Sequence, residues 1–321
     1  MRRILCVVNR PGWAHDRKTD ALVRGLADHY ALEKRFQADL TAEDLEAADA
    51  ILFYYWLQID ELPHLRALLR LRRERLLVGV CSHYELEGAW RAPALATLSE
   101  ARAVFVNNRL LLEELAPLLS VPIHYTPNGV DTTFFRPPVH PRAATTGLRV
   151  GWAGSLTNHG PTHRGVQEVI APAAALAGAE LCLAAREARW RTAAEMVDFY
   201  HSIDVYVCAS RSEGTPNPCL EAAACGLPVI TTPVGNMPEL IRDGVNGFLV
   251  RREADDVAAR LAQLRDDPDL RARMGRAARA TVEADWDWRH QALRYAPLFD
   301  LLPARGHGDP LPGSARAPHA P

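Results

Sequence analysis

The chain has 321 residues, 48% of them hydrophobic, which is enough for two domains that each bury a core of their own. Its 37 basic and 39 acidic side chains give a formal net charge of −2. This balance argues against nucleic acid as a partner, because proteins that coat a duplex carry a strong basic excess.

Targeting and membrane signals are weak. The first apolar run, residues 4–8, is too short for the core of a signal peptide, and no clean apolar stretch reaches the width of a bilayer. The six cysteines form no Cys-x-x-Cys pair, which favours buried, reduced thiols over a metal or redox site. We therefore expect a cytoplasmic protein that binds no metal ion.

Short apolar runs typical of strands alternate with amphipathic stretches in the first part of the chain. The expected strands are 4–8, 50–55, 76–81, 103–106 and 122–125, and the expected helices lie near 19–30, 61–73 and 109–119. Alternation of this kind predicts a parallel sheet with helices on both faces.

The alternation pauses at residues 137–147, which are rich in proline and poor in large apolar side chains and therefore predict an interdomain linker. A second series of strands follows at 148–154, 180–185, 204–210, 228–232 and 248–250. The predicted division is an N-terminal Rossmann-like domain over 1–140, a C-terminal Rossmann-like domain over 146–286 and a disordered tail over 303–321. The fold class is therefore α/β, with two doubly wound domains.

Two glutamates mark the end of the strand predicted at 204–210. Glu213 lies in the following loop, and Glu221 lies on a short helix for which Asn217 is the expected N-cap, Pro218 the first residue and Gly226 the left-handed end. Ligands of open parallel sheets bind beyond the carboxyl ends of the strands, where both carboxylates would lie. Taken alone, the two glutamates would more often be an ordinary loop residue and a solvated helix residue.

The flanks of these glutamates resemble the GT4-like retaining glycosyltransferases of the GT-B fold, which carry an E-x7-E signature. Glu213 and Glu221 have that spacing, and the similarity continues through 222–229, 233–240 and 243–250. Residues 127–137 resemble the family's hinge. The resemblance implies two domains that face each other across a cleft, with a last helix, 287–302, that crosses back to the first domain.

The resemblance also implies roles for single residues. Glu221 would bind the ribose hydroxyls of a nucleoside diphosphate sugar, and Glu213 would lie near the transferred sugar. His83, which follows the strand at 76–81, would touch that sugar as a second catalytic residue, although a histidine after a strand is often structural. Gly12 and Trp13, after the first strand, would help to form the acceptor pocket, although Pro-Gly is also an ordinary turn.

The donor diphosphate is expected at the turn after the strand at 148–154. Gly154 and Ser155 would bring backbone N–H groups to the phosphates, and Arg164 would stand where the family has a lysine. Ser155 replaces the arginine that the family usually has, and His163, Arg10 or Arg242 could compensate. The turn at Gly235 and Asn236 would offer further N–H groups to the donor.

Basic residues between Arg66 and Arg75 alternate with leucines on one expected helix. Such a helix permits peripheral contact with an anionic membrane, but a solvated helix face explains it as well.

The sequence thus predicts a glycosyltransferase that moves a sugar from a nucleoside diphosphate sugar to a hydroxyl-type acceptor, with retention and without a metal ion or other cofactor. The acceptor could be a small molecule, a glycan or a lipid-linked molecule. One alternative is a non-catalytic, donor-binding protein of the same fold, which the serine at 155 favours. A sugar-nucleotide epimerase is a second alternative, and the E-x7-E block argues against it.

Overall fold

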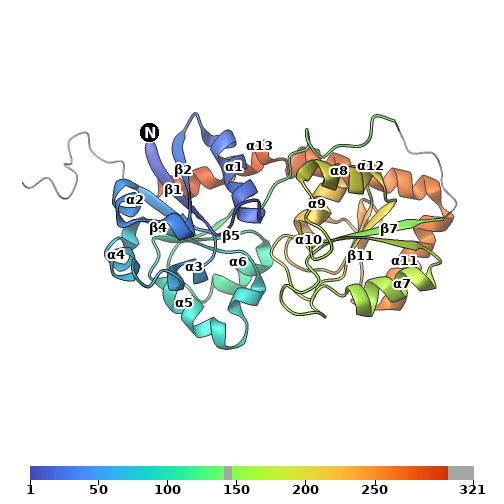
Figure 1. Ribbon diagram of the computed structural model, residues 1–321, viewed down its shortest axis with the longest axis horizontal. Coiled ribbons are helices and arrows are strands. Elements are labelled where there is room, and N and C mark those ends of the chain that lie inside the picture. Colours follow the sequence, from blue (N-terminus) through green and yellow to red (C-terminus); the bar gives the residue numbers. More distant parts are fainter. Residues whose placement is uncertain (141–146, 303–321) are drawn as a thin grey trace, which may run out of the picture.

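The computed structural model describes residues 1–140 and 147–302, which form two α/β domains side by side (Figure 1). Each domain contains one fully parallel sheet with helices packed against it. The prediction of two Rossmann-like domains is confirmed. The predicted disordered tail and most of the predicted linker lie outside the described residues.

The N-terminal sheet has six strands in the order β2-β1-β3-β4-β5-β6. These strands are β1 (Arg2–Val8), β2 (Tyr30–Phe36), β3 (Ala50–Phe53), β4 (Leu76–Val80), β5 (Ala103–Val106) and β6 (Ile123–Tyr125). The sequence analysis did not predict β2. This strand lies at the edge of the sheet and is mostly half-buried, so its sequence lacks the continuous apolar run that marks β1, β3 and β5.

The N-terminal helices are α1 (Ala14–Leu26), α2 (Ala42–Ala47), α3 (Leu57–Asp60), α4 (Arg66–Leu71), α5 (Arg91–Ser99) and α6 (Arg109–Leu115). The long basic helix expected at 61–73 is only α4, which has six residues, and Arg66 on it pairs with Asp60. The structure therefore gives the membrane contact no support. No helix among the described residues is both long and apolar enough to cross a bilayer.

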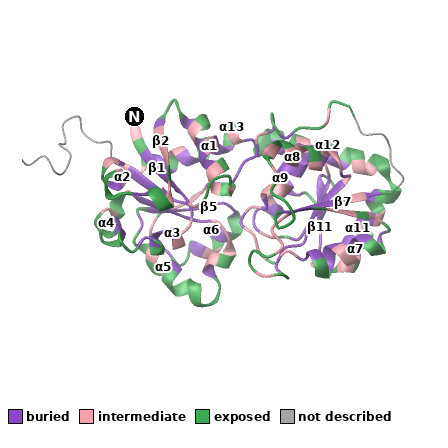
Figure 2. Cartoon of the chain, viewed as in Figure 1, coloured by how far each residue is buried: buried purple, intermediate pink, exposed green. Residues whose placement is uncertain are grey.

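The C-terminal sheet has five strands in the order β11-β10-β9-β7-β8. They are β7 (Arg149–Gly154), β8 (Glu180–Ala185), β9 (Val205–Cys208), β10 (Val229–Thr231) and β11 (Gly247–Leu249). The helices are η5 (Val166–Ile170), α7 (Ala171–Leu176), α8 (Ala193–His201), α9 (Asn217–Ala224), α10 (Met237–Leu240), α11 (Ala254–Asp266) and α12 (Pro268–Asp285). Figure 2 shows buried residues concentrated on the strands of both domains, as expected for sheets covered on both faces.

The chain then returns to the N-terminal domain through α13 (Trp288–Gln291), η6 (Ala292–Tyr295) and α14 (Ala296–Asp300). Tyr295, Leu298 and Phe299 are completely buried against the core around β1, β3 and β5. In Figure 1 this red segment lies behind α1 and β1. The end of the chain therefore joins the two domains a second time.

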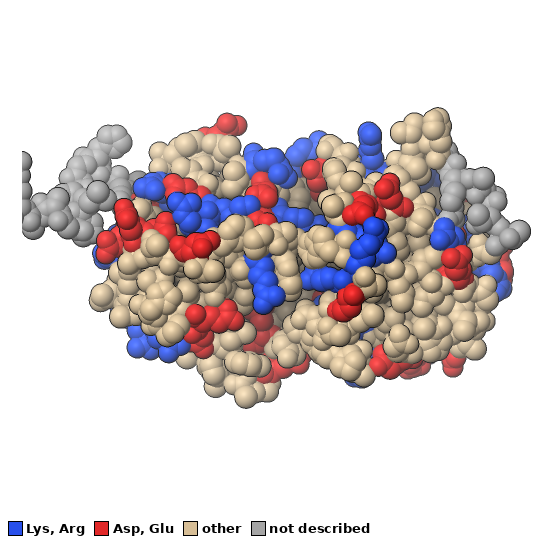
Figure 3. Space-filling view, in the orientation of Figure 1, with Lys and Arg blue, Asp and Glu red and all other residues tan. Residues whose placement is uncertain are grey.

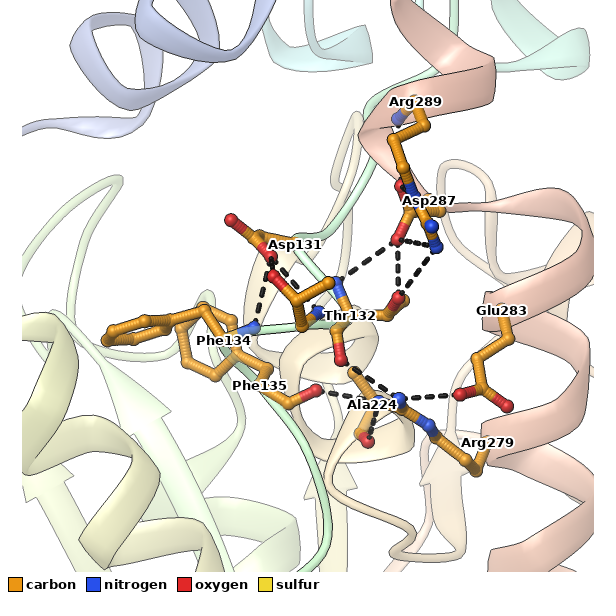
Figure 4. Close-up of polar contacts among 10 residues, drawn as sticks. Asp131, Thr132, Phe134, Phe135, Ala224, Arg279, Glu283, Asp287 and Arg289 are labelled. Atoms are coloured by element: carbon orange, nitrogen blue, oxygen red, sulfur yellow. Dashed lines mark hydrogen bonds and ion pairs between the residues drawn. The ribbon is translucent and has the colours of Figure 1, made fainter.

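The hinge between the domains is held by Arg279 of α12 (Figure 4). Its guanidinium donates hydrogen bonds to the carbonyl oxygens of Thr132 at 2.9 Å, Phe135 at 2.7 Å and Ala224 at 2.6 Å. Thr132 and Phe135 belong to the hinge segment, whereas Ala224 is the last residue of α9. One side chain thus ties the hinge to the helix that carries Glu221.

Asp287 fixes the other side of the same segment. Its carboxylate accepts hydrogen bonds from the Thr132 hydroxyl and from the Arg289 guanidinium, with the Arg289 Nε at 2.8 Å (Figure 4). Burial alone would raise the pKa of Asp287, but the hydrogen bonds from Arg289 and Thr132 outweigh burial and lower this pKa to about 2.

We predict that Asp287→Asn destabilises the protein at neutral pH by roughly 1.5–3 kcal/mol, the usual contribution of a hydrogen bond to a charged group. Because folding lowers the pKa of Asp287, its ionised form stabilises the fold above its ordinary pKa of 3.8, and this stabilisation disappears as the pH falls through about 2. Urea unfolding at several pH values should therefore separate variant and wild type at pH 7 and bring them together near pH 2.

The exposed neighbour Asp285 provides the control, since Asp285→Asn removes a carboxylate two residues away without touching the hinge. Equal loss of stability in both variants at pH 7 would contradict the assignment.

Candidate functional site

Glu221 lies where the two domains meet, and only 7% of it is exposed. Tyr200, completely buried on α8, donates its hydroxyl to Oε2 of Glu221 at 2.7 Å. From the other domain, Arg17 of α1 reaches Oε1 at 3.4 Å. Burial raises the pKa of Glu221, an effect that Arg17 and Tyr200 reduce. The buried Tyr200 therefore orients the carboxylate, and the more exposed Arg17 covers it.

Helix α9 positions Glu221 in a slightly different way from the prediction. The helix begins at Asn217, not after it, so the prediction that Asn217 is the N-cap was wrong by one residue. The Asn217 side chain instead accepts a hydrogen bond from Asn128 of the hinge at 3.1 Å, and Asn128 accepts one from Lys18 of α1 at 2.8 Å. Gly226 ends this segment with φ +80°, as predicted.

Glu213 forms an ion pair with Arg164, and both side chains are less than one-fifth exposed. Ser210, after the end of β9, donates its hydroxyl to Oε1 of Glu213 at 2.8 Å. The Nε atom of Arg164 is buried and has no partner among the described residues. The structure thus brings together two residues that the sequence analysis had assigned to the sugar and to the diphosphate.

The loop that carries Glu213 packs directly on the N-terminal domain. A Cβ atom at Gly214 would lie 1.4 Å from the carbonyl oxygen of Cys81, next to the end of β4, so only glycine permits this approach. The Gly214 carbonyl accepts hydrogen bonds from the backbone N–H of Asn236 at 3.1 Å and from the Asn108 side chain at 3.3 Å. Gly235 and Asn236 therefore support the Glu213 loop, and the N–H of Asn236 is already used.

The turn after β7 is occupied by a carboxylate of the chain itself. Glu187 accepts hydrogen bonds from the Ser155 hydroxyl at 2.5 Å and from the backbone N–H groups of Leu156 at 3.0 Å and Thr157 at 3.2 Å. Burial opposes ionisation of Glu187, but these bonds prevail and lower its pKa to about 2. Glu187 thus occupies the N–H groups of Leu156 and Thr157, directly after Gly154 and Ser155, where the diphosphate was expected.

The residues considered as substitutes for the missing arginine are dispersed. His163 lies next to Arg164, and its Nε2 is 2.8 Å from the carbonyl oxygen of Ser212. Arg242 lines a different cavity, together with α12 residues such as Ala277 and Thr281. Arg10 lies over the Trp13 ring, 5.0 Å from its centroid.

His83 lies in a short 3-10 helix after β4, and its Nε2 is 3.7 Å from the carboxylate of Glu114. Burial lowers the pKa of His83, although Glu114 opposes this effect. The hydrogen bonds and ion pairs of the described residues do not join His83 to Glu213 or Arg164. The neighbouring Tyr84 does face the other domain, with its ring centroid 4.4 Å from that of His159.

A cavity of about 270 Å³ opens between the domains beside Glu221. Four arginines line it: Arg17, Arg186, Arg189 and Arg191. The Arg186 guanidinium lies 4.4 Å from the Trp13 ring centroid and 5.0 Å from that of Trp190. Figure 3 shows the corresponding concentration of Lys and Arg side chains over the junction of the domains.

The sequence analysis missed the three arginines of 186–191. Their signal was present, because these residues directly follow β8, at the end of the sheet where ligands of parallel sheets bind. Gly12 also lines this cavity, and Trp13 contacts Arg186, while their role in an acceptor pocket stays a prediction.

Comparisons with known proteins agree with the sequence signature. Residues 189–281 match the family model described as glycosyl transferases group 1. Over 106 residues, the chain is 41% identical to the D-inositol 3-phosphate glycosyltransferase of Streptomyces scabiei. This aligned segment covers 33% of this chain and 24% of that protein. Over 127 residues it is 32% identical to the glycogen synthase of Mycobacterium tuberculosis, covering 39% of this chain and 30% of that protein. The matched segments therefore span less than a third of these relatives.

Similarity of fold extends further along the chain. Sucrose-phosphate synthase from Thermosynechococcus elongatus superimposes with a TM-score of 0.74 and 17% identity, over 94% of this chain and 98% of that one. HepE of Anabaena, in complex with UDP and glucose, gives a TM-score of 0.71 and 15% identity, over 94% and 100%. The predicted GT-B fold and the resemblance to group 1 glycosyltransferases are confirmed.

The position of Arg164, which is mostly shielded from solvent, generates a prediction about phosphate binding. Arg164→Ala should weaken the binding of a nucleoside diphosphate much more than that of the nucleoside, because hydrogen bonds between a guanidinium and a phosphate are about twice as strong as neutral ones. Arg164→Lys should restore part of the affinity. Calorimetry with both ligands measures the difference.

Arg273→Ala, on an exposed arginine of α12, provides the matched control and should leave both affinities unchanged. Equal losses for nucleoside and diphosphate in Arg164→Ala would mean that Arg164 has a structural role and does not bind the phosphates.

Proposed function

We propose that this protein is a glycosyltransferase that moves a sugar from a nucleoside diphosphate sugar to a hydroxyl-type acceptor, with retention of anomeric configuration. The family match and the fold support sugar transfer, and retention rests on the E-x7-E resemblance. On the sequence evidence alone, we also propose a cytoplasmic location and a reaction without a metal ion.

The observation that carries the proposal is the environment of Glu221. A carboxylate that is almost completely buried, oriented by Tyr200 and open to a cavity lined by arginines suits the vicinal hydroxyls of a ribose attached to a diphosphate. The ribose would replace Arg17, the more exposed of the two partners of Glu221. Released from the carboxylate, Arg17 would be free to approach the phosphates.

Departure of the nucleoside diphosphate builds negative charge on its oxygens, and the chain offers cations for that charge. Arg164 would approach the diphosphate after it separates from Glu213, and Arg186, which follows β8 in the same domain, lines the cavity beside Glu221. Glu213, on the loop after β9, would then face the transferred sugar. Among the described residues, no group of three or more His, Cys, Asp or Glu side chains is arranged to hold a metal ion.

The names of similar proteins span several donors and acceptors. HepE was solved with UDP and glucose, whereas a Corynebacterium glutamicum relative is a GDP-mannose-dependent phosphatidylinositol monomannoside mannosyltransferase. We therefore propose a nucleotide sugar as the donor and leave its base and sugar to experiment.

Incubation with a panel of UDP-, GDP- and ADP-sugars, with release of nucleoside diphosphate as the readout, tests the proposal. A transferase should release nucleotide from one donor, and should do so faster when a mixture of acceptors is present. Tight binding of a nucleotide sugar without release under any condition would instead identify the non-catalytic donor-binding protein.

The two glutamates should fail in different ways. Glu221→Ala should weaken nucleotide binding by at least roughly 1.5–3 kcal/mol, because it removes a charged acceptor of hydrogen bonds. Glu213→Gln should leave nucleotide binding nearly unchanged but lower kcat, because its expected partner is the sugar. Calorimetry and turnover, measured on both variants, separate the two roles. Loss of nucleotide binding in Glu213→Gln, with loss of kcat alone in Glu221→Ala, would show that the two roles are reversed.

A further inference from the structure

Another cavity, with a volume of about 540 Å³, lies on the N-terminal side of the cleft. It is formed at the carboxyl ends of three adjacent strands: Asn9 follows β1, Gln37 follows β2, and Tyr55 lies two residues after β3. Asn158, from the loop after β7, lines it from the other domain. Its volume lies within the range of about 300–1,000 Å³ typical of small-molecule sites.

The polar side chains of this cavity are held in place by a network beneath them. The side-chain amide of Gln58 is completely buried. It donates hydrogen bonds to the side-chain oxygen Oε1 of Gln37 at 3.3 Å and to the backbone carbonyl oxygen of Val7 at 3.0 Å. Gln37 in turn donates to Oε2 of Glu61 at 2.8 Å. Burial raises the pKa of Tyr55 to about 12, so its hydroxyl remains protonated at neutral pH.

The cavity is lined by both donors and acceptors of hydrogen bonds. Tyr55 offers a hydroxyl, Asn9 and Gln37 offer amides, and Glu61 offers a carboxylate. A sugar hydroxyl both donates and accepts hydrogen bonds and can use all of these groups, whereas an ionised phosphate can only accept.

The charge of this cavity differs sharply from that of the cavity beside Glu221. Among its described lining residues, Arg10 and Glu61 offset each other, and His64 is the remaining group that can become cationic. The described lining of the cavity beside Glu221 has four arginines against a single carboxylate, that of Glu221 itself. An anionic ligand would therefore favour the arginine-lined cavity, and the cavity at the ends of β1, β2 and β3 suits a neutral one.

We propose that this cavity binds the acceptor of the reaction, and that the acceptor is a neutral polyhydroxylated ring, a sugar or a cyclitol, selected by Glu61, Gln37 and Tyr55. The inference rests on the proposed function, because an acceptor exists only if sugar is transferred. Glu61 then has two effects: it accepts a hydrogen bond from a hydroxyl of the ring, and its negative charge repels a phosphorylated acceptor.

The test starts from the donor that the panel of nucleotide sugars identifies. Nucleotide release from that donor is measured with neutral acceptors, namely glucose, mannose and myo-inositol, and with glucose 6-phosphate, mannose 6-phosphate and myo-inositol 1-phosphate. We expect at least one neutral compound to accelerate release and its phosphate to be a poorer acceptor.

The variant Glu61→Gln keeps the shape of the side chain and removes its charge. It should raise the KM for the neutral acceptor by about tenfold, the loss expected for a charge-assisted hydrogen bond. It should also increase the ratio of phosphorylated to neutral acceptor use, and it should leave nucleotide affinity unchanged. Glu43→Gln, on an exposed position of α2, is the matched control and should alter none of these values.

The possible outcomes distinguish the two proposals. If no donor is turned over with any acceptor or with water, the proposed function fails. If nucleotide is released but the phosphorylated acceptors are preferred, or Glu61→Gln leaves both KM and the acceptor ratio unchanged, only the acceptor assignment is overturned.

Discussion

The position of α9 relative to the hinge is the constraint on which the site depends. Both ends of this helix are tied to the segment that joins the domains: Asn217 at its start bonds Asn128, and the carbonyl of Ala224 at its end accepts from Arg279. Because Arg279 also holds the hinge carbonyls of Thr132 and Phe135, a shift of the hinge would move the helix with it. Glu221 therefore keeps a fixed place between the domains.

The carboxylates of the cleft are bonded to other groups of the chain. Arg17 covers Glu221, Arg164 covers Glu213, and Glu187 fills the turn at Ser155. The first two contacts pair carboxylates that are largely buried, and a buried charge without a partner is costly, whereas the exposed Glu187 is held by hydrogen bonds from the turn. A nucleoside diphosphate would bring hydroxyls for one carboxylate and phosphates for the released arginines, so binding would exchange partners and leave no buried charge unpaired.

The sequence was sufficient to predict the fold class, most strands and the place of Glu213 and Glu221 after β9. Buried parallel strands and the E-x7-E block leave strong local patterns. It was insufficient for β2, whose edge position permits polar residues, and for the start of α9, where a hydrogen bond from Asn128 competes with capping by Asn217. The contact of Glu187 with the turn at Ser155 joins residues about thirty positions apart, and pairing at that distance depends on the sheet, which local patterns do not reveal.

The crystal structure of the chain with the nucleoside diphosphate that it releases would test the central claim most directly. The account predicts the ribose hydroxyls on Glu221 in place of Arg17, with Tyr200 still bound to the carboxylate and the diphosphate next to Arg164. A nucleotide bound elsewhere, with the Arg17–Glu221 and Arg164–Glu213 pairs intact, would contradict it.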